Sequence, residues 1–273
     1  MNVPPIRVAT PGPPPTSPER VTGGRVVEVL ADVATIGPWF AVATPAASGT
    51  VRWADLYAAP VPGGPDPLGR RIGEVTTALG GDRRIGASVA VMGLAARIVS
   101  MPFATVALHG VLPSLGELRR DPGAADPWAP SLSAGPTGVA TPDVADDPAG
   151  AADLLARELA ATHLDPLYAA VAARAVVSPR VLRGNVVSSI GGAARVMEAM
   201  RRPDRRRYLA LLDALADHPV LRGPLPSGAT GRLLRLDDTD ADTEWAFRRR
   251  SCCLYVRAPG GGTCGDCVLV GRA

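Results

Sequence analysis

The chain of 273 residues contains no lysine, and all 29 of its basic residues are arginine. We attribute this bias to codon usage in a GC-rich genome rather than to function. The arginines face 26 acidic residues, which leaves a formal net charge of only +3. Proteins that bind nucleic acid usually present a strongly basic face. The small net charge therefore gives no support to DNA or RNA as a partner.

Aromatic residues are also scarce, at 4% of the chain, whereas hydrophobic residues make up 47%. That share is enough for a core, which alanine, valine and leucine must largely fill. The length fits one large domain or one and a half. Glycine and proline, at 30 and 28 residues, stay below the level that marks a low-complexity chain.

Signals for export and for a membrane span are missing. Residues 1–22 lack the charged start, apolar run and cleavage site of a signal peptide and are rich in proline. We expect a disordered tail there. The longest apolar stretch, residues 85–115, is interrupted by Arg97 and Pro102. Because a membrane span needs about 20 predominantly apolar residues, two buried helices that meet at Pro102 explain the stretch better. We therefore predict a cytoplasmic protein without a membrane span, which leaves only a peripheral membrane contact open.

Apolar residues recur at helical spacing through most of the chain. The pattern predicts helices over residues 25–34, 70–79, 84–100, 102–112, 151–162, 163–177, 179–200 and 203–216. Residues 39–42 and 50–53 look extended and flank a turn-rich segment, which predicts a small N-terminal β-hairpin. The predicted fold class is mainly α, with a single helical domain over residues 23–245.

Residues 121–150 do not follow this pattern. They are dense in proline, glycine and aspartate and show no clear period. A structureless loop of that length is unusual inside a compact domain. The segment is therefore a variable insertion, a loop that covers a substrate, or a region of short strands that the pattern does not reveal.

Histidines offer little for catalysis. The chain has three, His109, His163 and His218, and none forms a spaced pair or lies next to serine, cysteine or carboxylates in a catalytic pattern. Structural roles are favoured over acid–base roles for all three.

All cysteines fall in the last 22 residues, where Cys252, Cys253, Cys264 and Cys267 have the spacing C-C-x10-C-x2-C. A disulfide framework would need an oxidising compartment, and a bridge between adjacent cysteines strains the backbone. A thioredoxin-like C-x2-C motif would need a βαβ context and would leave Cys252 and Cys253 without a role.

Four thiolates in a reducing compartment leave zinc or an iron–sulfur cluster. Structural zinc sites usually take their ligands from two separated C-x2-C knuckles. Cys252-Cys253 is not a knuckle, because consecutive side chains diverge on an extended backbone. That divergence suits two irons, whose terminal positions lie farther apart. The spacing therefore favours a 2Fe–2S cluster, while zinc and unliganded cysteines stay open.

The residues between the cysteine pairs favour chelation of either kind. Residues 254–257 predict a short strand, and residues 259–262, Pro-Gly-Gly-Gly, predict a tight reversal. Such a reversal would bring Cys264 back beside Cys252-Cys253. Gly265 gives the backbone the freedom to aim two thiolates at one site and to expose N–H donors to sulfur.

Four arginines flank the first cysteine pair: Arg248, Arg249, Arg250 and Arg257. Four thiolates around an oxidised 2Fe–2S core carry a charge of about −2, which reduction makes about −3. The arginines would favour the reduced state, or they would dock an acidic electron donor. A solvated basic run is the alternative for each of them.

These residues carry a family resemblance. Residues 247–255 (Phe-Arg-Arg-Arg-Ser-Cys-Cys-Leu-Tyr), 259–262 and 264–267 (Cys-Gly-Asp-Cys) resemble the C-terminal signature of FhuF-like ferric siderophore reductases. Residues 179–185 and 193–196 resemble the helical region of that family less specifically.

The resemblance implies a cytoplasmic, largely helical protein whose segment 246–273 holds a 2Fe–2S cluster on the four cysteines. The implied activity is one-electron reduction of ferric iron in an imported siderophore, typically a hydroxamate. The implied partners are the ferric siderophore and an electron donor such as a ferredoxin or a flavoprotein reductase. The alternative is a non-catalytic module that binds a siderophore or a protein and holds structural zinc.

Two aromatic residues near the motif are candidates for contact with the substrate. Trp245 lies just before the motif, and Tyr255 lies within it. Val256 stands where the family pattern has a second aromatic residue, which weakens the case for an aromatic platform.

Overall fold

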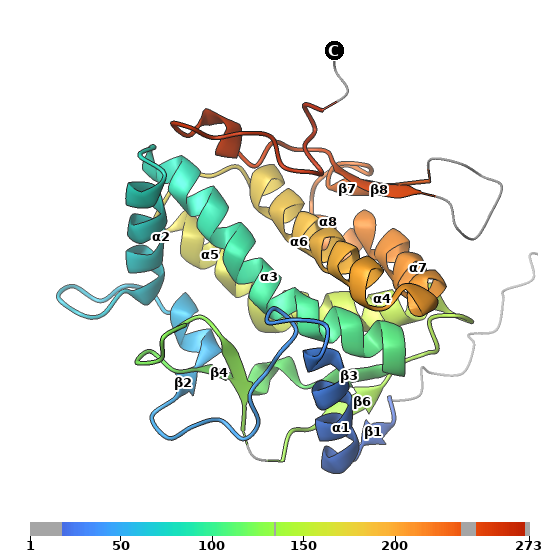
Figure 1. The fold of residues 1–273 in the computed structure, drawn as a ribbon. Coiled ribbons are helices and arrows are strands. Elements are labelled where there is room, and N and C mark those ends of the chain that lie inside the picture. Colours follow the sequence, from blue (N-terminus) through green and yellow to red (C-terminus); the bar gives the residue numbers. More distant parts are fainter. Residues whose placement is uncertain (1–17, 134, 236–243, 271–273) are drawn as a thin grey trace, which may run out of the picture.

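The computed structural model describes residues 18–133, 135–235 and 244–270, which form a mainly helical body (Figure 1). The helices are α1 (Gly23–Ala34), α2 (Pro67–Ala78), α3 (Arg83–His109), α4 (Pro148–Leu159), α5 (Asp165–Ala172), α6 (Pro179–Met200), α7 (Arg205–Ala216) and the short α8 (Pro219–Arg222). The predicted mainly α fold is confirmed. Most of the predicted tail, residues 1–22, lies outside the described residues, although Arg20 and Val21 form a short strand.

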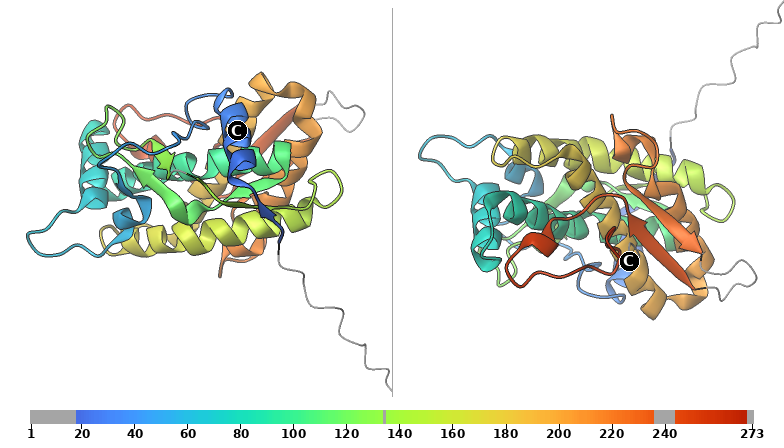
Figure 2. Two further views of the ribbon diagram at one scale, coloured as in Figure 1. Left: turned by 90° about the horizontal axis from the view of Figure 1, so that it is seen from below. Right: turned by 90° about the horizontal axis from the view of Figure 1, so that it is seen from above.

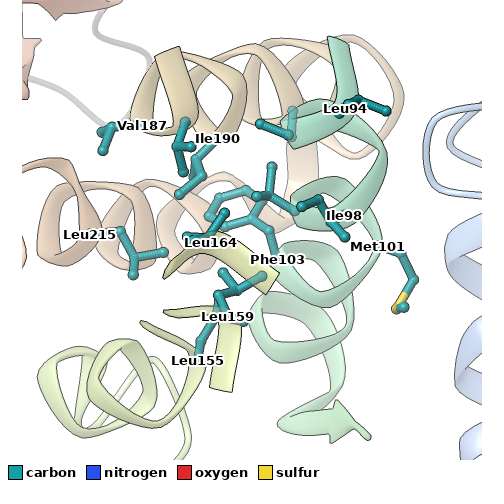
Figure 3. Close-up of a cluster of buried hydrophobic side chains, with 14 of the residues drawn as sticks. Leu94, Ile98, Met101, Phe103, Leu155, Leu159, Leu164, Val187, Ile190 and Leu215 are labelled. Atoms are coloured by element: carbon teal, nitrogen blue, oxygen red, sulfur yellow. The ribbon is translucent and has the colours of Figure 1, made fainter. Parts of the chain in front are cut away.

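Helices α3 and α6 pack against each other at the centre, and α1, α2, α4 and α7 surround them. Figure 3 shows the core at this junction, where side chains from several helices meet. They include Leu94, Ile98 and Phe103 of α3, Leu155 and Leu159 of α4, Val187 and Ile190 of α6, and Leu215 of α7. Burial of each such side chain stabilises the fold by about 1.5–3 kcal/mol.

Helix α3 is continuous, which corrects the prediction of two helices meeting at Pro102. Proline removes one helical hydrogen bond and usually breaks a helix. Here every residue from 98 to 107 is buried, so packing on all sides keeps the helix continuous past Pro102. Side-chain hydroxyls add donors nearby: Ser100 Oγ donates to Ala96 O at 2.8 Å and Thr105 Oγ1 donates to Pro102 O at 3.2 Å.

The length and composition of α3 would also suit a membrane span, but 72% of its apolar window is buried inside the protein. Its neighbours α1, α2 and α6 cover it. This is the burial expected of a core helix in a soluble protein, and α3 is the one described helix that passes the length and composition test.

The strands form small antiparallel sheets, none of which is the predicted N-terminal hairpin. One sheet has the strand order β1 (Arg20–Val21), β6 (Gly138–Ala140), β3 (Val111–Pro113). A second sheet has the strand order β2 (Val51–Arg52), β4 (Leu118–Arg120), β5 (Pro130–Leu132). Residues 39–42 form no strand, and β2 pairs with β4 instead. The hairpin prediction was wrong because the partner of β2 is distant in sequence. Strands β5 and β6 show that residues 121–150 contain short strands, the third of the interpretations above.

His163 has a structural role. Its Nε2 donates to Leu115 O at 2.9 Å, and the Tyr57 hydroxyl donates to its Nδ1 at 3.0 Å. Both bonds are made by a neutral ring, and burial lowers the pKa of His163 to about 4. His109 contacts Asp32, and His218 lies 3.7 Å from Asp153, in agreement with the structural roles expected for the histidines.

We expect His163 to make the fold acid-sensitive. The folded protein keeps the ring neutral while the unfolded chain protonates it near pH 6.5, so its stabilisation is present above pH 6.5 and is lost as the pH falls toward 4. Between pH 7 and pH 4.5 the free energy of unfolding should fall by about 2 kcal/mol more in the wild type than in His163→Asn. Urea unfolding of both proteins at the two pH values measures this, and equal losses would refute the assignment.

The last hairpin positions the C-terminal segment on the helical body. Strands β7 (Gly231–Arg235) and β8 (Trp245–Arg249) pair antiparallel, with Gly231 opposite Arg249. The Phe247 ring of β8 is fully buried and lies so close to Gly191 of α6 and to Gly231 that a Cβ at either position would overlap it. These glycines let β8 lie directly against α6, and the chain then runs over the helices (Figure 2).

Candidate metal centre

The four cysteines lie on a reversing segment, residues 250–270, which we call the cysteine segment. It crosses the ends of α3 and α6 on one side of the helical body (Figure 1). The predicted strand over residues 254–257 was wrong, because Leu254 adopts a left-handed conformation (φ 70°) and residues 255–257 form a 3-10 turn. The predicted reversal is present: Gly261 N donates to Ala258 O at 2.8 Å. No strand pairing is described within the segment.

The reversal brings the two cysteine pairs together. Cys253 Sγ and Cys264 Sγ lie 4.0 Å apart, and all four cysteines are free thiols. Cys253 and Cys267 are buried, whereas Cys252 and Cys264 are half-buried. Each pair thus contributes one buried and one half-buried cysteine. Within the described ranges, no group of three or more His, Cys, Asp or Glu residues is arranged to hold a single metal ion.

Backbone N–H groups point at the sulfurs. Leu254 N donates to Cys252 Sγ at 3.3 Å, and Leu269 N donates to Cys267 Sγ at 3.4 Å. The Tyr255 N–H donates to Cys253. Such bonds stabilise thiolate ligands and tune the potential of an iron–sulfur cluster. The sequence led us to expect donors near Gly265, whereas the observed donors follow the cysteines themselves.

The thiol of Cys253 is poised to ionise. Its hydrogen bond with Cys264 holds the pKa of Cys253 below its usual range, and the Tyr255 N–H and the Arg249 guanidinium act in the same direction. The same hydrogen bond, together with burial and the Asp266 carboxylate, raises the pKa of Cys264. The pair therefore holds one thiolate readily, and the thiolate is the form that binds metals.

A buried polar network ties the cysteine segment to the central helices. Arg249 Nη2 donates to Asn185 Oδ1 of α6, and Asn185 Nδ2 donates to Ser88 O of α3 at 2.8 Å. Ser88 Oγ in turn donates to Cys253 O at 2.7 Å. The network fixes the backbone that carries Cys253.

The charge of Arg249 provides a test of whether these residues fit an anionic cluster. Arg249 is 1% exposed, its Nε has no hydrogen-bond partner, and no carboxylate among the described residues forms an ion pair with it. An uncompensated buried charge is costly. The guanidinium acts on the Cys253 thiolate, whose pKa it helps to lower. A cluster of net negative charge on the cysteines would supply the missing counter-charge, so the residues fit a 2Fe–2S group.

Asp266 anchors the second cysteine pair. It lies between Cys264 and Cys267, is 2% exposed, and accepts a hydrogen bond from Ser188 Oγ of α6. Its backbone oxygen accepts from Arg249 N at 3.2 Å. The Cys264-Gly265-Asp266-Cys267 turn is therefore fixed to α6 and to the end of β8.

The other predicted arginines have different surroundings. Arg248 Nη1 donates to Cys267 O at 3.2 Å and to Val270 O at 3.1 Å, so it holds the returning chain. Arg250 and Arg257 are exposed, and their side chains make no hydrogen bond or ion pair within the part of the chain that the structure describes. The sequence grouped four arginines, of which the structure places two against the cysteine segment and two at the surface.

The two aromatic candidates are structural in their contacts. Trp245 Nε1 donates to Glu198 Oε2 of α6 at 2.9 Å, and the Tyr255 side chain packs at the edge of the core. Sequence reasoning gave no role at the metal centre to four residues that the structure places there, namely Ser88, Asn185, Ser188 and Asp266. The signal that could have found Asn185 is a polar side chain inside the apolar face of a predicted helix.

The family model of the FhuF 2Fe-2S C-terminal domain matches residues 249–269. Residues 249–269 therefore form an FhuF-type 2Fe-2S C-terminal domain. The match begins at Arg249 and contains all four cysteines, so it decides between the two metal centres that the spacing left open: the cofactor is a 2Fe–2S cluster. No curated protein and no solved structure gives a significant match to the chain.

The glycine turn should control how firmly the protein holds its cluster. A Cβ at Gly261 would overlap Tyr255 O and lie 2.9 Å from Ala258 O, whereas a Cβ at Gly262 would meet nothing within 4 Å. We expect Gly261→Ala to lose its visible absorbance several-fold faster than the wild type in excess chelator, because the turn between the cysteine pairs must deform. Gly262→Ala is the matched control, and equal rates for the two variants would refute the prediction.

Proposed function

We propose that this FhuF-like protein is a cytoplasmic ferric-siderophore reductase. It passes one electron to ferric iron in an imported siderophore, with hydroxamates as the expected class, and ferrous iron is released. The observation that carries the proposal is the FhuF 2Fe-2S C-terminal domain over residues 249–269. The half-buried Cys252 and Cys264 support it, because an electron must leave the protein close to an accessible sulfur.

The proposed reaction rests on the chemistry of iron. Ferric iron is a hard cation that charged oxygen donors hold tightly, and ferrous iron holds the same donors far more weakly. One electron therefore releases the metal and leaves the chelator intact. The 2Fe–2S group, when bound, supplies electrons one at a time.

The chain itself contributes position and charge. The thiolates of Cys252, Cys253, Cys264 and Cys267 would hold the cluster. The N–H donors of Leu254, Tyr255 and Leu269 spread the negative charge of the sulfurs, and the positive charge of the buried Arg249 stabilises the extra negative charge that reduction adds. All of these contacts favour the electron-rich state.

An acidic protein is the expected electron donor. Arg250 and Arg257 are exposed residues of the cysteine segment and present positive charge to solvent. Complementary charge speeds the encounter of redox partners. A ferredoxin or a flavoprotein reductase would fit this surface.

Anaerobic mixing tests the proposal. Protein reduced with one electron is mixed with the ferric complex of a trihydroxamate chelator, and a ferrous-specific dye captures the product. The expected result is reoxidation of the cluster with one ferrous ion captured for each electron. The gallium(III) complex of the same chelator is the control, because it has the same shape and accepts no electron.

If the ferric complex reoxidises the cluster no faster than the gallium complex does, the proposal fails. A protein that binds both complexes without transferring an electron would instead be the non-catalytic binding module.

A further inference from the structure

A groove of about 450 Å³ runs between α3 and α6 and ends at the second cysteine pair. Met92 and Gly93 of α3 line one side, and Ser188 and Gly192 of α6 line the other. Residues 264–266 close one end, so an accessible cysteine forms part of the wall. The volume lies in the range of small-molecule sites.

Small residues keep this groove open. A Cβ built at Gly93, Gly192 or Gly265 would meet no atom within 4 Å. A larger side chain would therefore fit at each of these three positions without a clash. The glycines leave free space on both helices and beside Cys264.

The groove combines an apolar surface with positive charge. Trp39, which is 40% exposed, lies in its wall, as do Arg71 and Arg195. Arg195 is exposed and has no hydrogen bond or ion pair with the described residues. The Arg71 guanidinium lies 5.4 Å from the centroid of the Trp128 ring, and its Nη1 lies 3.4 Å from Glu74 Oε2. The single acidic residue in the lining, Asp266, is buried and bonded to Ser188.

We infer that this groove binds the ferric chelate, and that Arg71 and Arg195 make it prefer chelates of negative charge over cationic ones. The inference rests on the proposed function, which supplies the occupant. The two arginines attract chelates of negative charge. A chelate in the groove would also lie against Cys264, a cluster ligand, which places its iron close to the electron source. The Trp39 ring and the α3–α6 walls contact the apolar spacers of the chelator.

Binding of redox-inert complexes tests the groove without any electron transfer. The probes are two gallium(III) complexes of one linear trihydroxamate, the first with its terminal ammonium group and the second with that amine succinylated to a carboxylate. Titration calorimetry of the cluster-loaded, full-length protein should show tighter binding of the succinylated complex, by about tenfold. Arg195→Glu should remove or reverse this preference. Since Arg195 is exposed and makes no hydrogen bond or ion pair with the described residues, the variant should fold normally.

A second variant blocks the groove. Gly192→Leu places a side chain into the open space and should weaken both complexes at least tenfold while the visible spectrum of the cluster stays that of the wild type. The matched control is Gly73→Leu in α2, whose Cβ also meets nothing within 4 Å and which does not line the groove. It should bind both complexes as the wild type does.

The outcomes separate this inference from the proposed function. If Gly192→Leu and Arg195→Glu bind both complexes with wild-type affinity, the groove assignment is overturned, even where the wild type reduces ferric chelates. If the wild type binds the gallium complexes through Gly192 and Arg195 but never reduces the ferric ones, the groove assignment stands and the reductase proposal fails.

Discussion

Replacement of Cys264 by serine is expected to abolish assembly of the 2Fe–2S cluster while the helical circular dichroism stays almost unchanged. A serine hydroxyl is a poor substitute for a thiolate as an iron ligand, and Cys264 is one partner of the 4.0 Å contact between the two cysteine pairs. Cys264 is half-buried on the outside of the helical body and takes no part in the hydrophobic core. The substitution should therefore prevent cluster binding without unfolding the protein.

Three measurements on the same sample check this result: visible absorption, iron and sulfide content, and far-ultraviolet circular dichroism. Cys252→Ser should behave in the same way, because Cys252 is also half-buried and accepts the Leu254 N–H. Thr263→Ser, one residue before Cys264 and exposed, is the control and should load normally. A full, stable cluster in Cys264→Ser would contradict the ligand assignment.

The sequence predicted the helical body and the approach of the two cysteine pairs, because both leave local signals. Apolar residues at helical spacing identify α3 and α6. The cysteine spacing and the glycine turn indicated a metal centre before any contact was known. The half-buried state of Cys252 and Cys264 agrees with an accessible cluster.

The features that the sequence did not predict depend on contacts between residues far apart in the chain. Strand β2 pairs with β4, more than sixty residues away, so no hairpin pattern could predict it. Pro102 lies inside α3 because burial on every side outweighs one missing hydrogen bond. Leu254 turns the chain with a positive φ that leucine seldom adopts, which explains the wrongly predicted strand.

The role of Arg249 depends on the same kind of tertiary context. In sequence it is one of three consecutive arginines, and only the fold distinguishes it from its neighbours. Burial, the bond to Asn185 and the action on Cys253 belong to Arg249 alone, while Arg250 faces solvent. A run of like residues can thus contain one buried charge that the pattern cannot identify.

Substitution of Arg249 by methionine should make the cluster harder to reduce. Reduction adds negative charge close to a buried guanidinium that lacks an ion-pair partner among the described residues. A single charge inside a protein changes a one-electron equilibrium by roughly tenfold, which corresponds to about 60 mV. We therefore expect the midpoint potential of Arg249→Met to fall by on the order of 60 mV, as measured by spectroelectrochemical titration.

Two further variants isolate the effect of the charge. Arg250→Met removes an exposed charge with no side-chain partner among the described residues, and its potential should stay close to that of the wild type. Arg249→Lys keeps the charge but loses the planar guanidinium that bonds to Asn185, so its potential should lie nearer the wild type than that of Arg249→Met. Equal potentials for Arg249→Met and Arg250→Met would show that the buried arginine does not favour the reduced state.

The central claim is that the four cysteines of the FhuF-type C-terminal domain hold a 2Fe–2S cluster, and the metal content of the purified protein tests it most directly. Iron, zinc and acid-labile sulfide are measured in anaerobically purified protein, together with its visible spectrum before and after dithionite. We expect two irons and two sulfides per chain, no zinc, and a red-brown absorption that bleaches on reduction. A colourless protein with one zinc per chain would contradict the account.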